Sequence, residues 1–427
     1  MNIILADDCT MSIGTKDNRI SETSCILGDN SLQCLTIYGQ SCQSGKLNAY
    51  NGSTFYAVSV KRYAQRGGNV TIDASQRGAF WLTDGDNFTF SGGTLTAIPN
   101  SLYGISTTGT VSISWTSATD RITVSKYSGT VTIADGKAFY NGSEVLTGTF
   151  TSQSDKSKLN GKTLTPAVIL ADNADNNTAI ATAATVCTGS KTLAVKLAGR
   201  TLYKDGNWNT LCLPFDVTIA DSPLKDDGVD VRTLSSSDFS NGTLTLTFTN
   251  EGAVTTMEAG KPYIIKWNNT GATLTEDDLV FENVTMSSTA ADVTTNFVDF
   301  CGTFSPEVIY ESGDEKHNLY LGGGNTLYYP TAEGFEVNSC RAYFVLKNGL
   351  TVGVDDLPEQ SGGHTKVRAF NLSFGDEDDV TGILSTTDDT DFTDSDDAWY
   401  TLDGRKLSGK PSQRGVYIRG GRKIAVQ

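Results

Sequence analysis

Short runs of alternating apolar and polar residues recur along most of this 427-residue chain. Two clear examples are TVSISW at 110–115 and TLTLT at 243–247. A period of two places the apolar side chains on one face of a β-strand, and the Gly, Asn and Asp clusters between the runs favour tight turns. Helical periodicity is nearly absent, apart from an Ala-rich segment after Asp172 that predicts one helix. The pattern therefore predicts an all-β protein.

The first 163 residues repeat a short element: Gly or Asn, then an apolar residue, a Thr or Ser, and another apolar residue. The copies recur at intervals of roughly ten to twenty-odd residues, which is typical of a parallel β-solenoid. In such a coil the strands point apolar side chains inward while Gly and Asn turn the corners. We therefore expect residues 1–163 to form a parallel β-solenoid similar to a right-handed β-helix. An antiparallel sandwich would contain similar strands and is the alternative.

Three further segments are predicted downstream. Residues 164–360 combine the predicted helix with many short strands, which indicates a β-sandwich-like domain. The stretch from Asp376 to Asp397 holds ten acidic residues and no Lys or Arg, so residues 361–397 are predicted to be an acidic flexible linker. Residues 398–427 contain three short strands separated by turn signals and are predicted to be a small β tail.

The start of the chain carries no recognisable signal peptide. Met1 is followed directly by an apolar strand, IILA at 3–6, without a basic segment or a long apolar run. We therefore expect the chain to begin inside a domain, with its first unit truncated at the N-terminus. No stretch reaches the length that a bilayer-spanning helix needs.

Two sets of motifs resemble exported Bacteroidetes proteins. The last residues resemble the C-terminal sorting and anchoring tails of secreted Bacteroidetes proteins, in WYTLDGRKL at 399–407, GVYI at 415–418 and GRKIAV at 421–426. A second set of segments resembles exported Prevotella- and Bacteroides-type proteins of unknown function. These segments are GNWNTLCLPFD at 206–216, AGKPYIIKW at 259–267, FCGTF at 300–304, NLYLGGGNTLYYP at 318–330 and SCRAYFVL at 339–346. The repeats before residue 163 resemble carbohydrate-binding β-helices of bacterial surface proteins. The resemblance implies an extracellular or outer-surface location and brings no known chemistry.

Charge and titratable residues argue against several classes of function. A formal net charge of −16 argues against nucleic-acid binding, which needs a basic face. The eight cysteines lack zinc-site spacing, and those from Cys187 onward lie in or beside apolar strands as single buried thiols, with one or two disulfides as the alternative. The two histidines, His317 and His364, are not accompanied by a nucleophile elbow. We therefore favour a non-catalytic protein.

One part of the first unit gathers cations and aromatic residues in an otherwise acidic chain. A basic groove edged by rings would hold an acidic glycan, because the cations pair with carboxylates and the rings stack on sugar faces. The predicted ligand-binding residues are Lys61, Arg62, Tyr63, Arg66, Arg77 and Trp81. The alternative is that the cations are solvated strand-end residues and the rings pack in the core. Core packing is also the favoured role of Trp208 and Trp267, which lie in apolar strands.

A turn shortly after these residues carries oxygen atoms of the kind that Ca²⁺ prefers. The predicted metal ligands are Asp84, Asp86 and Asn87, and no other cofactor is predicted. Ordinary turn chemistry explains the same three residues without a metal.

These observations favour an exported, surface-associated protein that acts in adhesion or glycan binding through the long face of its first unit. Its partner would be a polysaccharide or a glycan of a host or cell surface. A rival interpretation is a β-helix polysaccharide lyase or hydrolase that acts on acidic glycans near Lys61 and Arg77. A third is a structural spacer that presents another part of a larger protein.

Overall fold

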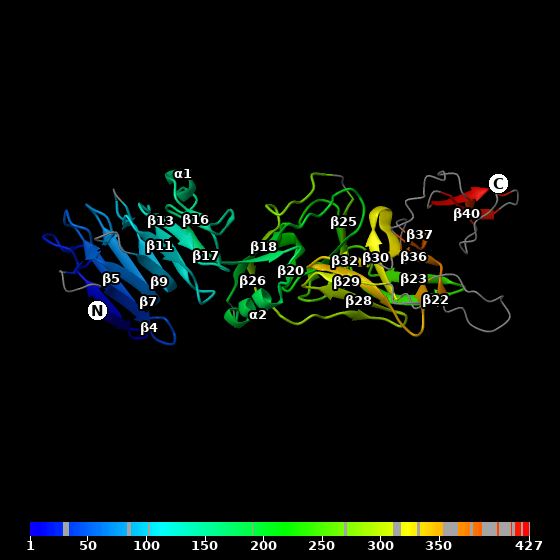
Figure 1. The fold of residues 1–427 in the computed structure, drawn as a ribbon, viewed down its shortest axis with the longest axis horizontal. Coiled ribbons are helices and arrows are strands. Elements are labelled where there is room, and N and C mark those ends of the chain that lie inside the picture. The colour runs from blue at the N-terminus through cyan, green and yellow to red at the C-terminus, as the bar shows by residue number, and fades with distance from the viewer. Residues whose placement is uncertain are drawn as a thin grey trace. The chain divides into compact units, whose positions relative to one another are not determined.

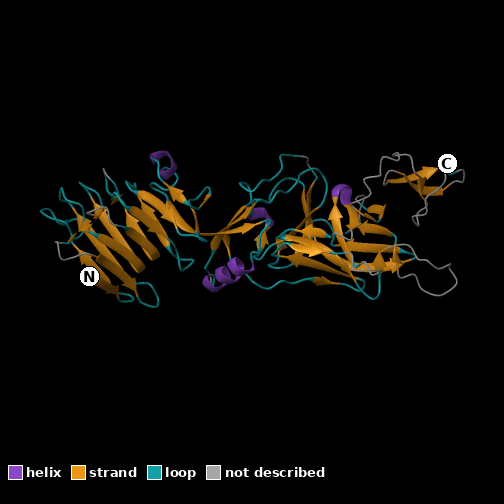
Figure 2. Ribbon diagram, viewed as in Figure 1, coloured by secondary structure: helices purple, strands orange, loops and turns teal. Residues whose placement is uncertain are grey.

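The computed structural model describes the chain except for residues 29–33, 83–86, 101–102, 190, 269–270, 311–316, 331–333, 353–365, 376–378, 387–398, 401–410, 412–414, 420–421 and 427. Strands hold 50% of the residues and helices 6%. Figure 2 shows the strands in orange and the few helices in purple. The all-β prediction is therefore confirmed. Within the described stretches, every helix is too short or too polar for a membrane crossing.

The chain folds into two compact units, and neither is continuous in sequence (Figure 1). Unit 1 consists of Met1–Ile169, Thr182–Lys196 and Val280–Thr285. Unit 2 consists of Leu170–Ala181, Leu197–Leu279 and Met286–Gln427.

The strands of unit 1 pair in parallel along three rows, and Figure 1 shows β4, β7 and β9 of these rows side by side. Row one contains β1 (Asn2–Leu5), β4 (Cys34–Gly39), the first halves of β7 (Arg62–Ala74) and β9 (Phe88–Ala97), β11 (Thr110–Ile113) and β13 (Thr130–Ile133). Row two contains β2 (Thr10–Ile13), β5 (Lys46–Asn51), the second halves of β7 and β9, and β12 (Arg121–Val124). Row three contains β3 (Ile26–Leu27), β6 (Val58–Val60), β8 (Phe80–Leu82) and β10 (Ile105–Ser106).

The register of these rows aligns the apolar positions of the sequence pattern. Along row one the paired residues are Leu35, Tyr63, Phe88, Val111 and Val131, and each is buried. The rings of Tyr63 and Phe88 stack with centroids 4.7 Å apart. Because alternate residues of a strand point to opposite faces, the intervening polar residues face outward. The alternation in the sequence thus places one apolar side chain of each strand in the core.

Antiparallel strands end the first two rows. β17 (Thr163–Ala171) pairs antiparallel with β12 and with β14 (Ala138–Tyr140), which also pairs with β15 (Val145–Leu146). β13 pairs antiparallel with β16 (Thr149–Phe150), and α1 (Gln153–Lys156) follows. Unit 1 also takes in most of β18 (Leu193–Ala198) and all of β26 (Val280–Val284), which pair with each other. The predicted boundary at 163/164 therefore differs from the observed one, because β17 belongs largely to the first unit.

Unit 2 contains several small sheets and one main core. The two largest sheets are β22 (Leu234–Ser240), β23 (Thr243–Phe248), β36 (Ala369–Ser373) and β37 (Val380–Ile383), and β27 (Val293–Thr294), β28 (Val298–Thr303), β33 (Arg341–Leu346), β30 (Asn318–Gly322), β31 (Thr326–Tyr329) and β38 (Ser385–Thr386). A three-stranded sheet contains β19 (Asn209–Cys212), β25 (Pro262–Trp267) and β21 (Val229–Arg232). Three pairs complete the unit: β20 (Val217–Thr218) with β24 (Thr256–Met257), β29 (Glu307–Ile309) with β32 (Phe335–Val337), and β34 (Thr351–Val352) with β35 (Lys366–Val367). The core combines residues of the β22-containing and β28-containing sheets, such as Leu246 and Phe370 with Phe300 and Phe344.

The helix expected after Asp172 is α2 (Asn177–Val186). It begins a turn later than the Ala-rich pattern suggested, because the side chain of Asn176 bonds the backbone N–H and carbonyl of Ala171 at 3.0 and 2.9 Å. Asp172 itself forms an ion pair with Arg341, with a closest distance of 2.8 Å. The prediction of a helix is therefore confirmed, with a later start.

The predicted acidic linker at 361–397 differs from the structure over its central part. β36 pairs in parallel with β23, and its Phe370 and Leu372 are buried in the core of unit 2. The dense acidic residues on either side obscured the alternation of AFNLS at 369–373. Residues 361–365, 376–378 and 387–397 of that prediction lie outside the described residues.

The C-terminal segment contains the three expected strands. β39 (Trp399–Tyr400), β40 (Gly415–Arg419) and β41 (Arg422–Val426) pair antiparallel in that order. The pairing agrees with the strand and turn signals of the sequence, and says nothing about sorting.

Candidate functional site

The predicted ligand-binding residues divide between two sheets of unit 1. Arg62 and Arg66 are exposed on β7, and the guanidinium of Arg66 lies 5.9 Å from the ring centre of Tyr38. Lys61 is half-buried at the corner between β6 and β7. Tyr63 lies in the core and is no surface residue, since it is only 2% exposed and its hydroxyl donates to Gln65 at 3.1 Å. Its position follows from the strand period, which turns it away from Arg62.

Arg77 and Trp81 each contact a third residue, Tyr56, beside row three. The rings of Tyr56 and Trp81 have centroids 5.4 Å apart, with planes inclined at 32°. The guanidinium of Arg77 lies 5.3 Å from the centre of the Tyr56 ring. Trp81 remains 40% exposed although it packs against Tyr56. An exposed indole held by a neighbouring ring and cation is a typical stacking surface for a ligand with an apolar face.

Gly78 allows this packing. A Cβ atom at Gly78 would lie 2.2 Å from Cε1 of Tyr56 and 2.5 Å from the carbonyl oxygen of Tyr103. The Tyr56 ring therefore occupies the space that a side chain at position 78 would need. A residue without a side chain is required here for Tyr56 to reach Trp81.

A similar pair lies in the adjoining turn of the chain. Ala79 N–H donates to the carbonyl of Tyr103, which places Tyr103 beside Gly78, and the ammonium of Lys126 lies 4.8 Å from the centre of the Tyr103 ring. We call these residues together the Trp81 surface, comprising Tyr56, Arg77, Trp81, Tyr103 and Lys126.

The stretch from residue 61 to residue 81 carries a net positive charge although the chain is acidic, and Asp84 and Asp86 follow it in the sequence. Between residues 61 and 81 the only acidic residue is Asp73. Both of its carboxylate oxygens accept hydrogen bonds from Arg19, at 2.8 and 3.1 Å. The one acid of the stretch is thus neutralised by a cation from elsewhere. An anionic ligand would meet little repulsion from this part of unit 1.

The predicted calcium ligands are only partly described. Asp84 and Asp86 lie outside the described residues. Asn87 is described, and its side-chain oxygen accepts the backbone N–H of Thr110 at 3.2 Å. Over the described part of the chain, no three His, Cys, Asp or Glu residues gather in a way that would hold a metal ion.

Other residues singled out in the sequence lie in structural positions. Trp208 and Trp267 are buried, and the indole N–H of Trp267 donates to the carbonyl of Leu224 at 3.2 Å, so core packing is confirmed for both. Nδ1 of His317 lies 3.0 Å from the carbonyl oxygen of Leu350, and His364 falls outside the described residues. All eight cysteines are free thiols, and Cys187, Cys212 and Cys340 are buried as predicted, whereas Cys301 is only half-buried. Burial raises the pKa of Cys340 to about 11, which makes its thiol unreactive at neutral pH.

The sequence reasoning missed three members of the Trp81 surface: Tyr56, Tyr103 and Lys126. A signal for the two tyrosines was present, since YAVS at 56–59 and YGIS at 103–106 are copies of one motif. The register aligns these copies, because Val58 pairs with Phe80 and Phe80 with Ile105. Aligning the repeats by their buried residue would therefore have placed both tyrosines on one face.

Comparisons with known proteins give no match: no family model, no curated protein and no solved structure is similar to this chain.

Proposed function

We propose that this protein binds acidic glycans through the Trp81 surface. The observation that carries the proposal is the exposed indole of Trp81, which packs against the Tyr56 ring, while the guanidinium of Arg77 lies over that same Tyr56 ring. An exposed ring suits the apolar face of a sugar, and a nearby cation suits a uronate or sulfate group. The net positive charge of residues 61–81 in a chain of net charge −16 supports an anionic rather than a neutral glycan.

The ligand is an oligosaccharide rather than a single sugar. Tyr56 and Tyr103 precede strands of row three that are two positions apart. Neighbouring strands are about 4.8 Å apart, so these two sites are separated by about 10 Å. A ligand that lies along row three from the position of Tyr56 to the Tyr103–Lys126 pair therefore spans more than one sugar ring.

The scaffold for this surface is proposed to be a parallel β-solenoid. Support comes from the three rows of parallel pairing and from the aligned buried residues along each row. For unit 2 we propose a β-sandwich-like arrangement, supported by the core shared between the β22- and β28-containing sheets. A solenoid presents equivalent positions of successive turns on one long face, which suits an extended polysaccharide.

We further propose that the protein is exported and acts at the outer cell surface as an adhesin. The support is the likeness of the segment after residue 398 to Bacteroidetes sorting tails. Deleting residues 399–427 should retain the protein inside a Bacteroidetes host, measured by immunoblotting of cell and surface fractions. Unchanged surface exposure of the truncated protein would refute this part of the proposal.

Binding is tested with a glycan array, followed by calorimetry on pectic and glycosaminoglycan oligosaccharides with and without Ca²⁺. Replacing Trp81 with Ala should weaken binding about tenfold or more, the scale of an interface hot spot. Arg77→Gln should weaken binding of acidic glycans and leave that of neutral ones unchanged. The matched control is Phe55→Ala, an aromatic residue that is 56% exposed near the same surface.

Equal affinity of the Trp81→Ala and Phe55→Ala proteins would exclude the Trp81 surface as the binding site. Unsaturated products appearing from the same substrates would instead favour the lyase. No binding to any glycan would leave the structural spacer as the better interpretation.

A further inference from the structure

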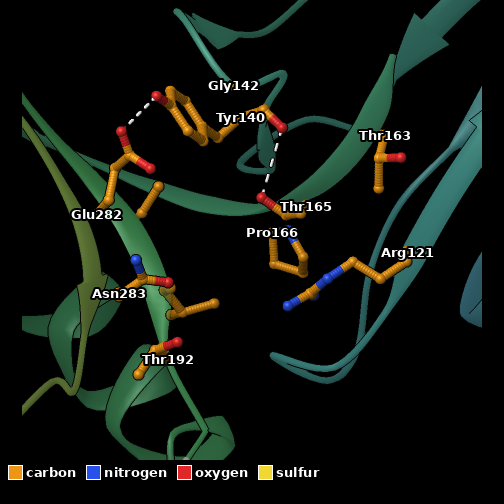
Figure 3. Close-up of a pocket in the computed structure, with 11 residues that line it drawn as sticks. Arg121, Tyr140, Gly142, Thr163, Thr165, Pro166, Thr192, Glu282 and Asn283 are labelled. Carbon is orange, nitrogen blue, oxygen red and sulfur yellow. Dashed lines mark hydrogen bonds between the residues drawn. The ribbon is translucent and has the colours of Figure 1, made fainter. Parts of the chain in front are cut away.

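Unit 1 also contains a hollow whose lining residues lie well apart in the sequence from the residues of row three. It has a volume of about 200 Å³ and opens where β12, β14, β17, β18 and β26 meet (Figure 3). Every lining residue belongs to unit 1, although some come from Thr182–Lys196 and Val280–Thr285. The sequence gives no motif for this hollow, because its walls come from three separate segments of the chain.

Arg121 supplies the positive charge of the hollow. Its Nη1 donates to the carbonyl oxygens of Ala118 and Asp120, each at 2.7 Å. In Figure 3 its guanidinium points past Pro166 toward the wall that carries Asn283. Burial lowers the pKa of Arg121, which means that its charge has lost part of its hydration. Nη2 and Nε remain as donors for a ligand.

The nearest carboxylate is already used by the backbone. The Asp120 side chain accepts from the N–H groups of Gly93, Thr116 and Ser117 at 2.8, 2.7 and 2.8 Å. Among the described residues, no carboxylate forms an ion pair with Arg121. The Asp120 carboxylate acts on this guanidinium through space but forms no ion pair with it, so the half-buried guanidinium is able to pair with an anionic ligand.

The opposite wall offers hydrogen-bonding groups. The hydroxyl of Tyr140 donates to Oε1 of Glu282 at 2.7 Å, as Figure 3 shows. Burial, followed by the nearby Glu282, raises the pKa of Tyr140 to about 12, so this hydroxyl keeps its proton at neutral pH. Glu282 therefore stays a hydrogen-bond acceptor in the lining of the hollow, where its carboxylate is able to accept from a ligand hydroxyl. Thr163, Thr192 and Asn283 add polar atoms to the rim.

We propose that this hollow binds a small hydroxylated carboxylate of the size of one sugar acid. The carboxylate accepts from Nη2 and Nε of Arg121, a planar arrangement that guanidinium matches and ammonium does not. Hydroxyl groups of the ligand donate to Glu282 and bond the threonines of the rim. The volume lies below the roughly 300 Å³ at which drug-sized sites begin, which restricts the ligand to one ring.

The test measures binding of glucuronate, glucose and acetate by ligand-observed NMR. All arms use the Trp81→Ala protein, so that the outcome is independent of the glycan-binding proposal. We expect glucuronate to bind, glucose to bind at least about tenfold more weakly, and acetate to compete weakly, since a charged hydrogen-bond pair contributes on this scale. Arg121→Gln should lower glucuronate affinity about tenfold or more.

Lys162→Gln is the matched control, because it removes a charge from an exposed residue next to Thr163 without lining the hollow, and it should leave affinity unchanged. Where Arg121→Gln does not fold, Arg121→Lys decides, since it retains the charge and loses the planar pair of donors. Equal binding of glucuronate and glucose, or unchanged glucuronate binding by a folded Arg121 variant, would overturn the proposal.

Discussion

At the scale of single residues, the Trp81 surface depends on an amino acid that contacts no ligand. Gly78 has a backbone conformation that any residue adopts, so its importance is steric rather than conformational. The obstacles to a side chain are the Tyr56 ring, which is able to turn, and the backbone carbonyl of Tyr103, which is fixed by pairing. A side chain at position 78 would therefore disturb both the pairing of row three and the packing of Tyr56 against Trp81.

Gly78→Ala should destabilise the protein by about 1–3 kcal/mol, the usual cost of overpacking a filled site. It should also reduce glycan affinity, because Tyr56 must leave its place beside Trp81. Urea unfolding and calorimetry measure the two effects. Gly323→Ala is the control, since nothing lies within 4 Å of a Cβ added there. Equal stability of the two variants would show that Tyr56 moves freely and that Gly78 is not required.

At the scale of elements, one hydrogen bond joins strands that are distant in sequence. Tyr140 on β14 and Glu282 on β26 are 142 residues apart and form a bond of 2.7 Å. The raised pKa of Tyr140, about 12, means that the folded state holds this proton more tightly than the unfolded state, in which a tyrosine titrates near 10. The resulting stability is fully present below pH 10 and is lost as the pH rises through about 12.

Tyr140→Phe should therefore flatten the fall in unfolding free energy between about pH 10 and 12, relative to the wild-type protein. Urea unfolding at a series of alkaline pH values measures this slope. Tyr203→Phe serves as the control, since Tyr203 is 58% exposed. The same slope in Tyr140→Phe and wild-type protein would mean that burial and the bond to Glu282 do not raise the pKa of the Tyr140 phenol.

At the scale of the whole molecule, each of the two units is built from three separate segments of the chain, so no single cut in the sequence divides them. β17 pairs with both β12 and β14, so it closes two strand edges at once. A cut at the predicted boundary of 163/164 would remove nearly all of this strand and leave both edges open. Open strand edges pair readily with other chains.

A fragment of residues 1–163 should therefore aggregate more than a fragment of residues 1–171, which keeps β17 and leaves open only the β17 edge that β18 covers in the full chain. Size-exclusion chromatography at equal concentration measures the difference, and circular dichroism shows whether each fragment keeps its strands. Monomeric behaviour of both fragments would mean that β17 is dispensable for unit 1 and that the predicted boundary is adequate.

Much of the fold was readable from local pattern. Alternation predicted the strands, the Ala-rich run predicted α2, and turn signals predicted the three C-terminal strands, because each depends on residues close in sequence. The segment around Phe370 was misread as part of a linker, since its burial depends on pairing with β23, more than a hundred residues earlier. Arg77 and Trp81 were found by composition, but Tyr56 was not, because the repeats at 56–59 and 103–106 have to be aligned by their buried residue before Tyr56 and Tyr103 fall on one face.

The sequence by itself determined the all-β class and which residues alternate between core and surface, because both follow from a period of two along each strand. Only the tertiary structure decided which strands became neighbours, which outward residues met as the Trp81 surface, and that Arg121, Tyr140 and Glu282 line one hollow. The physical reason is that pairing partners and unit boundaries depend on contacts between segments far apart in the sequence. A local pattern of residues contains no information on the free energy of those contacts.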